Sequence, residues 1–154
     1  MLLLKNIFVI LHVITAAAWF GLGLRLSGQA RSVTLLEPAK AMPLANDIGR
    51  SVYYMNVFIV LTLVFSVVAF LLGGAFAGYG PVYHTSLLLI LIMTAVQLFV
   101  IRTGWNNLHD ALSKGTGDTE PHRKRVAMGT GIGHLLWLVI LVLMFWNQIA
   151  PAFR

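Results

Sequence analysis

Apolar residues gather in four long runs along this chain, and shorter polar stretches separate them. The runs cover residues 6–24, 52–76, 82–101 and 126–149. An α-helix needs about 20 mostly apolar residues to cross the hydrocarbon core of a bilayer. The pattern therefore predicts four transmembrane helices. Lys5 before the first run resembles the start of a signal peptide, but no small-residue cleavage site follows, so we expect a retained helix.

The stretches between the runs differ sharply in charge. The connection between the second and third runs, "GGAFAGYGPVY", has no charged residue, whereas the other two connections hold nine of the eleven basic residues. These nine are Arg25, Arg31, Lys40, Arg50, Arg102, Lys114, Arg123, Lys124 and Arg125. Basic loops stay in the cytoplasm. We therefore expect both basic connections inside and both termini outside.

The connections also suggest local structure. Glycines and Pro81 in the uncharged connection predict a tight turn, with the proline opening the next helix. The first basic connection is long enough for a short interfacial helix broken by Pro38 and Pro43. Residues 113–125 are expected to form a solvated polar loop. Together these features predict one all-α, up-and-down bundle of four transmembrane helices over residues 1–154.

Composition supports a membrane protein. Hydrophobic residues make up 58% of the chain and charged residues 10%, against about 25% charged in a soluble domain. The absence of cysteine excludes disulfides, thiolate metal sites and c-type haem attachment. The net charge of +6 lies in the connections, where it orients the helices, so we expect a lipid bilayer and no nucleic acid as partner. We expect a multi-pass protein of the bacterial inner membrane.

Histidines are the notable polar residues of the apolar runs. His12 lies in the first, His84 near the start of the third and His134 in the fourth, while no Asp or Glu lies well inside any run. Ionisable residues within a membrane helix are rare and usually functional. The lack of carboxylates argues against an ion-coupled transporter. The plainer interpretation of each histidine is an interhelical hydrogen bond of roughly 1 kcal/mol.

Neutral imidazole binds haem iron, copper and zinc. Since cysteine is absent, haem b and copper are the candidates, and helical bundles commonly hold haem between facing histidines. At 1.5 Å per residue, His12 lies about 20 Å, His84 about 27 Å and His134 about 14 Å above the cytoplasmic helix ends. The side chains of His12 and His84 both lean outward. We therefore predict that His12 and His84 hold one haem, with His134 serving a second site or none.

Two further features lie near these histidines. Trp19 shares the helix face of His12. In "GTGIG", Gly129 and Gly133 form a small-xxx-small pair, which allows close helix packing or clears space for a flat cofactor.

Three short motifs carry a family resemblance. They are "HVITAAAWFG" in the first helix, "RSVYY" in the second and "VYHTSLLL" in the third. With the size and helix count, they resemble the small membrane-bound protoporphyrinogen oxidases of the HemJ kind. The resemblance implies a haem b site whose ligands are His12 and His84. That family typically has lysine where this chain has Ser86. A looser similarity links the chain to the membrane domain of CopD-type copper-resistance proteins.

These observations leave three functions open. The first is a b-type haem protein with a redox or electron-transfer role, an oxidoreductase with quinone or porphyrin as partner. Its cofactor-binding residues would be His12, His84, His134, Trp19 and Ser86, with His12 and His84 as metal ligands. The second is a cofactor-free accessory subunit of a larger membrane complex. The third is copper handling by His12, His84, Met93 and Met144. Small-residue faces also favour a homo-oligomer or a subunit of a complex.

Overall fold

The computed structural model describes residues 2–78, 80–115 and 117–146, which are helical almost throughout and contain no strand. Four helices are long and apolar enough to cross a membrane. In order, the elements are α1 (Leu2–Thr34), α2 (Pro38–Leu72), the single turn α3 (Ala75–Gly78), α4 (Pro81–Ala95), the π-helical segment η1 (Val96–Ile101), α5 (Arg102–Lys114) and α6 (Glu120–Met144). α4, η1 and α5 follow one another without a break and make one long helix.

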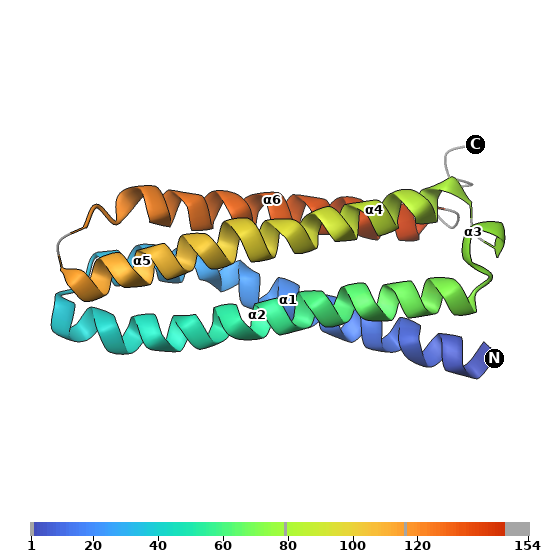
Figure 1. The fold of residues 1–154 in the computed structure, drawn as a ribbon, viewed down its shortest axis with the longest axis horizontal. Coiled ribbons are helices and arrows are strands. Elements are labelled where there is room, and N and C mark those ends of the chain that lie inside the picture. Colours follow the sequence, from blue (N-terminus) through green and yellow to red (C-terminus); the bar gives the residue numbers. More distant parts are fainter. Residues whose placement is uncertain (1, 79, 116, 147–154) are drawn as a thin grey trace.

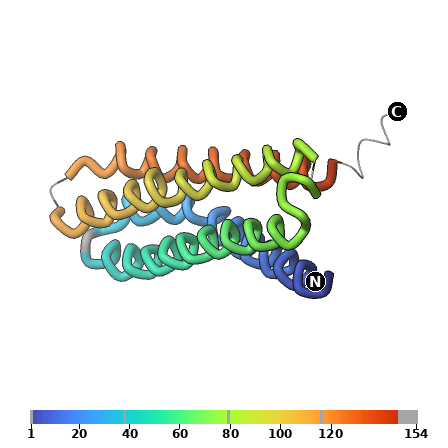
Figure 2. The backbone as a smooth tube through the Cα atoms, turned by 45° about the vertical axis from the view of Figure 1, so that its right-hand side comes forward, coloured from blue at the N-terminus to red at the C-terminus, as the bar shows by residue number. Residues whose placement is uncertain are grey.

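The long helices lie side by side and alternate in direction, so the start of α1 and the end of α6 share one end of the bundle (Figures 1 and 2). The α1–α2 hairpin packs against α6 and the α4–η1–α5 helix. The predicted all-α, up-and-down membrane bundle is confirmed, as is the multi-pass character of the chain.

The first basic connection is mostly helical, but the expected short interfacial helix broken at Pro38 and Pro43 is wrong: the connection consists of the ends of α1 and α2, and α2 runs through Pro43. α1 continues ten residues beyond the predicted end to Thr34, and only residues 35–37 separate it from α2. The reason is an amphipathic pattern that a membrane-length window overlooks: Leu26, Ala30 and Val33 are buried at helical spacing while the residues between them face outward. Pro38 begins α2, where its missing N–H costs nothing, and Pro43 is accommodated inside the helix.

The other predicted ends also shift. The third helix continues past residue 101 as α5, because Gly104, Trp105 and Leu108 provide a buried stripe on an otherwise polar segment. α6 begins at Glu120 rather than 126. α2 ends at residue 72 rather than 76, where glycines follow and Gly74 adopts a φ of 98°. Residues 147–149 of the predicted fourth helix lie outside the described residues.

One exposed arginine ends the uncharged run of each long helix. These are Arg25, Arg50, Arg102 and Arg125. Contacts between neighbouring helices place them at a similar level: Gly49 lies beside Trp105, Gly104 beside Arg125, and Gly23, two residues before Arg25, beside Met55 of α2. We refer to this level as the arginine plane. Helices of 33 to 35 residues span about 50 Å, against about 30 Å of hydrocarbon, so the bundle projects beyond the membrane on the arginine side.

The projecting part has a tight core of its own. Its buried side chains, each at most 1% exposed, are Leu26, Ala30, Val33, Ala41, Ala45, Ile48 and Leu108. Alanine at three of these positions lets the helix backbones approach closely. The charged part of the chain is therefore a compact helical cap on the membrane bundle.

The orientation can be tested by cysteine labelling, because the natural chain contains no cysteine. We expect Ala77→Cys, in the uncharged connection, to react with a membrane-impermeant maleimide on intact cells. Ser113→Cys, at the end of α5, should react only after the membrane is permeabilised. The reverse pattern would overturn the assignment of the arginine plane to the cytoplasmic side.

Candidate functional site

His12 is a buried imidazole with one nitrogen held in place. It lies on α1, is 8% exposed, and its Nδ1 is 3.1 Å from the backbone carbonyl oxygen of Thr62 on α2. A carbonyl can only accept a hydrogen bond, so Nδ1 carries the proton. In the neutral ring Nε2 therefore keeps its lone pair, and no described residue forms a hydrogen bond with it. This is the arrangement in which histidines bind metals.

Threonine hydroxyls reinforce the contact between α1 and α2 at this level. The Oγ1 atoms of Thr15 and Thr62 are 2.9 Å apart, and both residues are buried. The Thr15 hydroxyl donates to the carbonyl of Leu11, and the single proton of the Thr62 hydroxyl is shared between Oγ1 of Thr15 and the carbonyl of Phe58. The ring of His12 is thus fixed by a polar cluster that spans two helices.

Two small apolar cavities lie against His12. The first has a volume of about 110 Å³, and its walls include His12 from α1, Phe70 from α2, and Tyr83 and Ser86 from α4. The second has a volume of about 90 Å³, and its walls include His12, Ala16, Met93 and Met144. Ile90 and Ile140 line both cavities. His12 therefore lies next to unfilled space inside the bundle.

Ser86 and Trp19 occupy different places relative to this space. Ser86 lines the first cavity, and its hydroxyl donates to the carbonyl of Val82 in its own helix. Trp19 lines neither cavity. Its indole N–H donates to Oε1 of Gln97 at 3.0 Å, and Nε2 of Gln97 donates to Oδ1 of Asn56 at 2.8 Å. This chain of buried hydrogen bonds links α1, η1 and α2 in the middle of the bundle, and π-helical turns such as η1 are frequent at functional sites.

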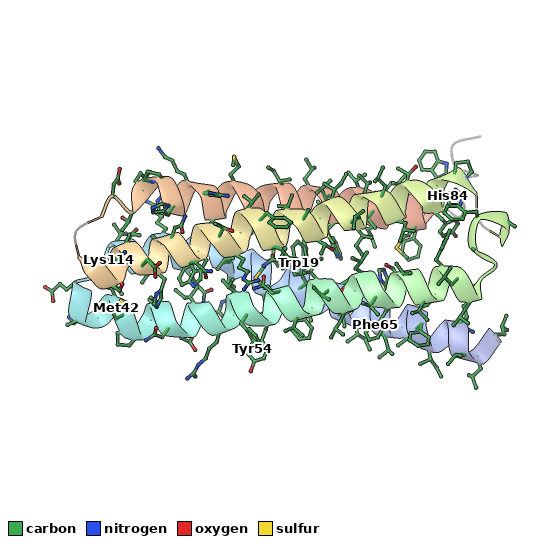
Figure 3. The ribbon with its side chains drawn as sticks, in the orientation of Figure 1. Trp19, Met42, Tyr54, Phe65, His84 and Lys114 are labelled. Atoms are coloured by element: carbon green, nitrogen blue, oxygen red, sulfur yellow. The ribbon has the colours of Figure 1, made fainter. Side chains whose placement is uncertain are left out.

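His84 lies beside the first cavity without lining it. Its ring packs 5.0 Å from that of Phe76 and 5.6 Å from that of Phe70, which is a cavity residue. Its Nε2 is buried without a hydrogen-bond partner among the described residues. Figure 3 shows His84 near the start of α4, well along the bundle from Trp19. The structure thus places His84 outside the cavity, in contact with Phe70, which lines it.

His134 belongs to a separate aromatic cluster. Its ring centroid lies 4.8 Å from that of Phe20, and Phe20 stacks on Trp137 at 4.2 Å. Its Nε2 is buried without a partner, and a Cβ added to Gly23 would lie 2.7 Å from it. His134 is therefore packed against the α1 backbone and lines neither of the cavities beside His12.

The glycine pair of α6 serves helix packing. A Cβ on Gly133 would lie 2.9 Å from the ring of Trp19, and one on Gly129 would lie 2.8 Å from Ile101. Side chains already occupy the space that these glycines clear, so the close-packing interpretation is confirmed for both. Gly131 between them has no atom within 4 Å of its Cβ position.

Several site residues could not be singled out from sequence. Thr62 acts through its backbone carbonyl, which no sequence pattern reveals. Gln97 and Asn56 stand out only as polar residues in apolar runs, and nothing in their spacing pairs them across helices. Among the described residues, no three His, Asp or Glu side chains form a metal-binding group.

Comparison of the chain with protein-family models, curated proteins and solved structures finds no match. The fold and the site define a four-helix membrane protein with an oriented imidazole beside apolar cavities.

The glycine contacts predict opposite effects of one substitution at neighbouring positions. Gly→Ala within a helix is intrinsically favourable by about 0.5–1 kcal/mol, so Gly131→Ala should leave stability unchanged or raise it slightly. Gly133→Ala should destabilise by about 1–3 kcal/mol through overpacking, because the Gln97 hydrogen bond holds Trp19 in place. Thermal unfolding in detergent measures both. Equal effects of the two variants would contradict the packing role.

Proposed function

We propose that this protein is a membrane-spanning b-type haem protein with an electron-transfer role, in which His12 would hold the haem iron. The observation that carries the proposal is the state of the His12 ring. Its Nδ1 is bound to the Thr62 carbonyl, its Nε2 is left without a hydrogen bond, and the residue lines apolar cavities in the membrane region. A ring nitrogen that keeps its lone pair and lies beside unfilled space is able to bind a metal ion.

The surroundings of His12 offer a second imidazole as a haem ligand, but the cavity is small for a haem. His84 is the candidate for the second ligand, because its Nε2 is also unpartnered and its neighbour Phe70 lines the same cavity. The cavity of about 110 Å³ is smaller than the about 300–1,000 Å³ of usual ligand sites. Haem binding therefore requires Phe70 and the residues shared by both cavities, such as Ile140, to move apart.

Bound haem b would supply reversible one-electron transfer. In this arrangement the Thr62 carbonyl would keep the His12 ring in one orientation and one tautomer, as second-shell groups do. The apolar walls would exclude water from the site. Ser86 stands where the resembled oxidase family has lysine, and its hydroxyl bonds to its own helix, so it offers no cation to a porphyrin substrate. We therefore favour electron transfer, with a quinone of the bilayer as partner, over porphyrin oxidation.

Absorption spectra of the purified, haem-supplemented protein test this proposal. We expect a Soret band and sharp α and β bands after reduction by dithionite. His12→Ala should lose them, and added imidazole should restore them by occupying the vacated position. His84→Ala should change the spectrum to that of a singly ligated haem.

The matched control is His109→Ala, because His109 lies on α5 in the projecting cap and bonds to Asn46. Its spectrum should equal that of the wild type. A folded wild type with no Soret band would refute the haem assignment. It would leave a cofactor-free accessory subunit of a larger membrane complex as the better account.

A specific observation supports copper(I) as a second candidate. Met93 and Met144 line the second cavity together with His12, and soft thioether and imidazole ligands suit copper(I). Met93→Leu conserves volume and should preserve folding. We expect it and Met144→Leu to weaken copper(I) binding at least tenfold in competition with a chromogenic chelator.

Met128→Leu is the control for this measurement, because Met128 is 58% exposed and lines neither cavity. It should bind copper(I) as the wild type does. Identical affinity in all three methionine variants would rule out the copper site.

A further inference from the structure

A polar groove lies between α2 and α5, away from the His12 cavities. Its volume is about 550 Å³. The polar residues that line it are Tyr53 and Asn56 from α2 and Arg102, Asn106, His109 and Asp110 from α5. The groove runs from Asn56, on the membrane side of the arginine plane, past Arg102 in that plane and on toward the projecting cap. No step of the proposed electron transfer uses it.

The guanidinium of Arg102, like those of Arg25 and Arg50, has no hydrogen bond or ion pair among the described residues, and of these three only Arg102 lines the groove. The two arginines of α6 near the arginine plane have partners in the protein. Arg123 forms a two-bond pair with Glu120, and Arg125 donates to the carbonyl of Phe99. Arg102 therefore presents a fixed positive charge with its donors available to a ligand.

The groove around Arg102 is rich in hydrogen-bond donors. Oδ1 of Asn56 already accepts a bond from Gln97, so its second polar atom, the amide nitrogen, is left to donate. Asn106 and the Tyr53 hydroxyl form no hydrogen bond within the described part of the chain. The carboxylate of Asp110 is 68% exposed and lies 4.0 Å from Nδ1 of His109. The end of the groove at Arg102 thus suits an anion with several acceptor oxygens.

The position of the groove relative to the membrane indicates the source of that anion. The arginine plane ends the uncharged helix runs, so it lies at the level of lipid phosphates on the basic side of the membrane. Tyr53 and Trp105 add aromatic rings there, as in an interfacial belt. Basic pockets between helices on this side hold anionic headgroups. We propose that the groove binds the phosphate of an anionic phospholipid, with Arg102 as its main ligand.

This assignment has a structural consequence. Asn56 lines the groove and is also the last member of the hydrogen-bond chain that runs through Gln97 to Trp19. A lipid held by Arg102 and Asn56 would tie α2 to α5 at one end of that chain. Binding should therefore raise the thermal stability of the folded bundle by mass action.

A titration in detergent tests the proposal. Short-chain phosphatidylglycerol should raise the unfolding temperature of the wild type in a saturable way, while phosphatidylcholine of the same chain length should not. Arg102→Gln should weaken the apparent affinity at least tenfold, since a charge-assisted phosphate contact is lost. Asn106→Ala should weaken it less. Because Arg102 has no hydrogen-bond or ion-pair partner among the described residues, Arg102→Gln should keep the unliganded unfolding temperature.

Arg25→Gln is the matched control. It removes the same charge at the same plane, and Arg25 does not line the groove. It should bind phosphatidylglycerol as the wild type does. Three results would overturn the proposal: no stabilisation of the wild type, equal losses in Arg25→Gln and Arg102→Gln, or equal stabilisation by phosphatidylcholine. Equal stabilisation by inorganic phosphate alone would overturn the lipid as the source of the anion.

Discussion

The structure depends on one constraint, which is that a polar group in hydrocarbon must find its partner within the protein because no water is available. Two clusters meet this requirement. His12, Thr15 and Thr62 join α1 to α2, and Trp19, Gln97 and Asn56 join α1, η1 and α2. These bonds leave the helices little freedom to rotate or slide, since any displacement would break the hydrogen bonds of several buried polar groups at once. They therefore determine which faces of α1, α2 and η1 point inward.

Packing density varies along the bundle, and regions of different density have different roles. In the projecting cap, alanines and Leu26 close the core almost completely. In the middle, Gly129 and Gly133 bring α6 against Ile101 and Trp19. Toward the uncharged end, the small and apolar side chains around His12 leave two cavities instead. The cap and the middle provide rigidity, and the unfilled part is the region able to admit a ligand.

Whether a polar group without a hydrogen-bond partner can bind a ligand depends on the space next to it. Nε2 of His134 has no hydrogen-bond partner, but Gly23 closes the space in front of it, so it contributes to packing. His12 lies beside open space with its ring held by Thr62. Arg102 lies in a groove whose other walls also carry donors. Only the last two combine a free group with room for a partner, and this is why the proposed functions rest on them.

The sequence alone determined the fold class, the number of crossings and the rare polar residues within them, because apolar run length and charge are local properties that the bilayer reads directly. It could not determine the helix ends, since α1, α2 and α5 continue on amphipathic faces, such as that of Leu26 and Ala30, which are stable only when a neighbour covers them. The partners of the histidines were also decided by tertiary structure. His12 meets a carbonyl fifty residues away, and His134 meets a glycine of another helix, because helix rotation and depth follow from packing of the whole bundle.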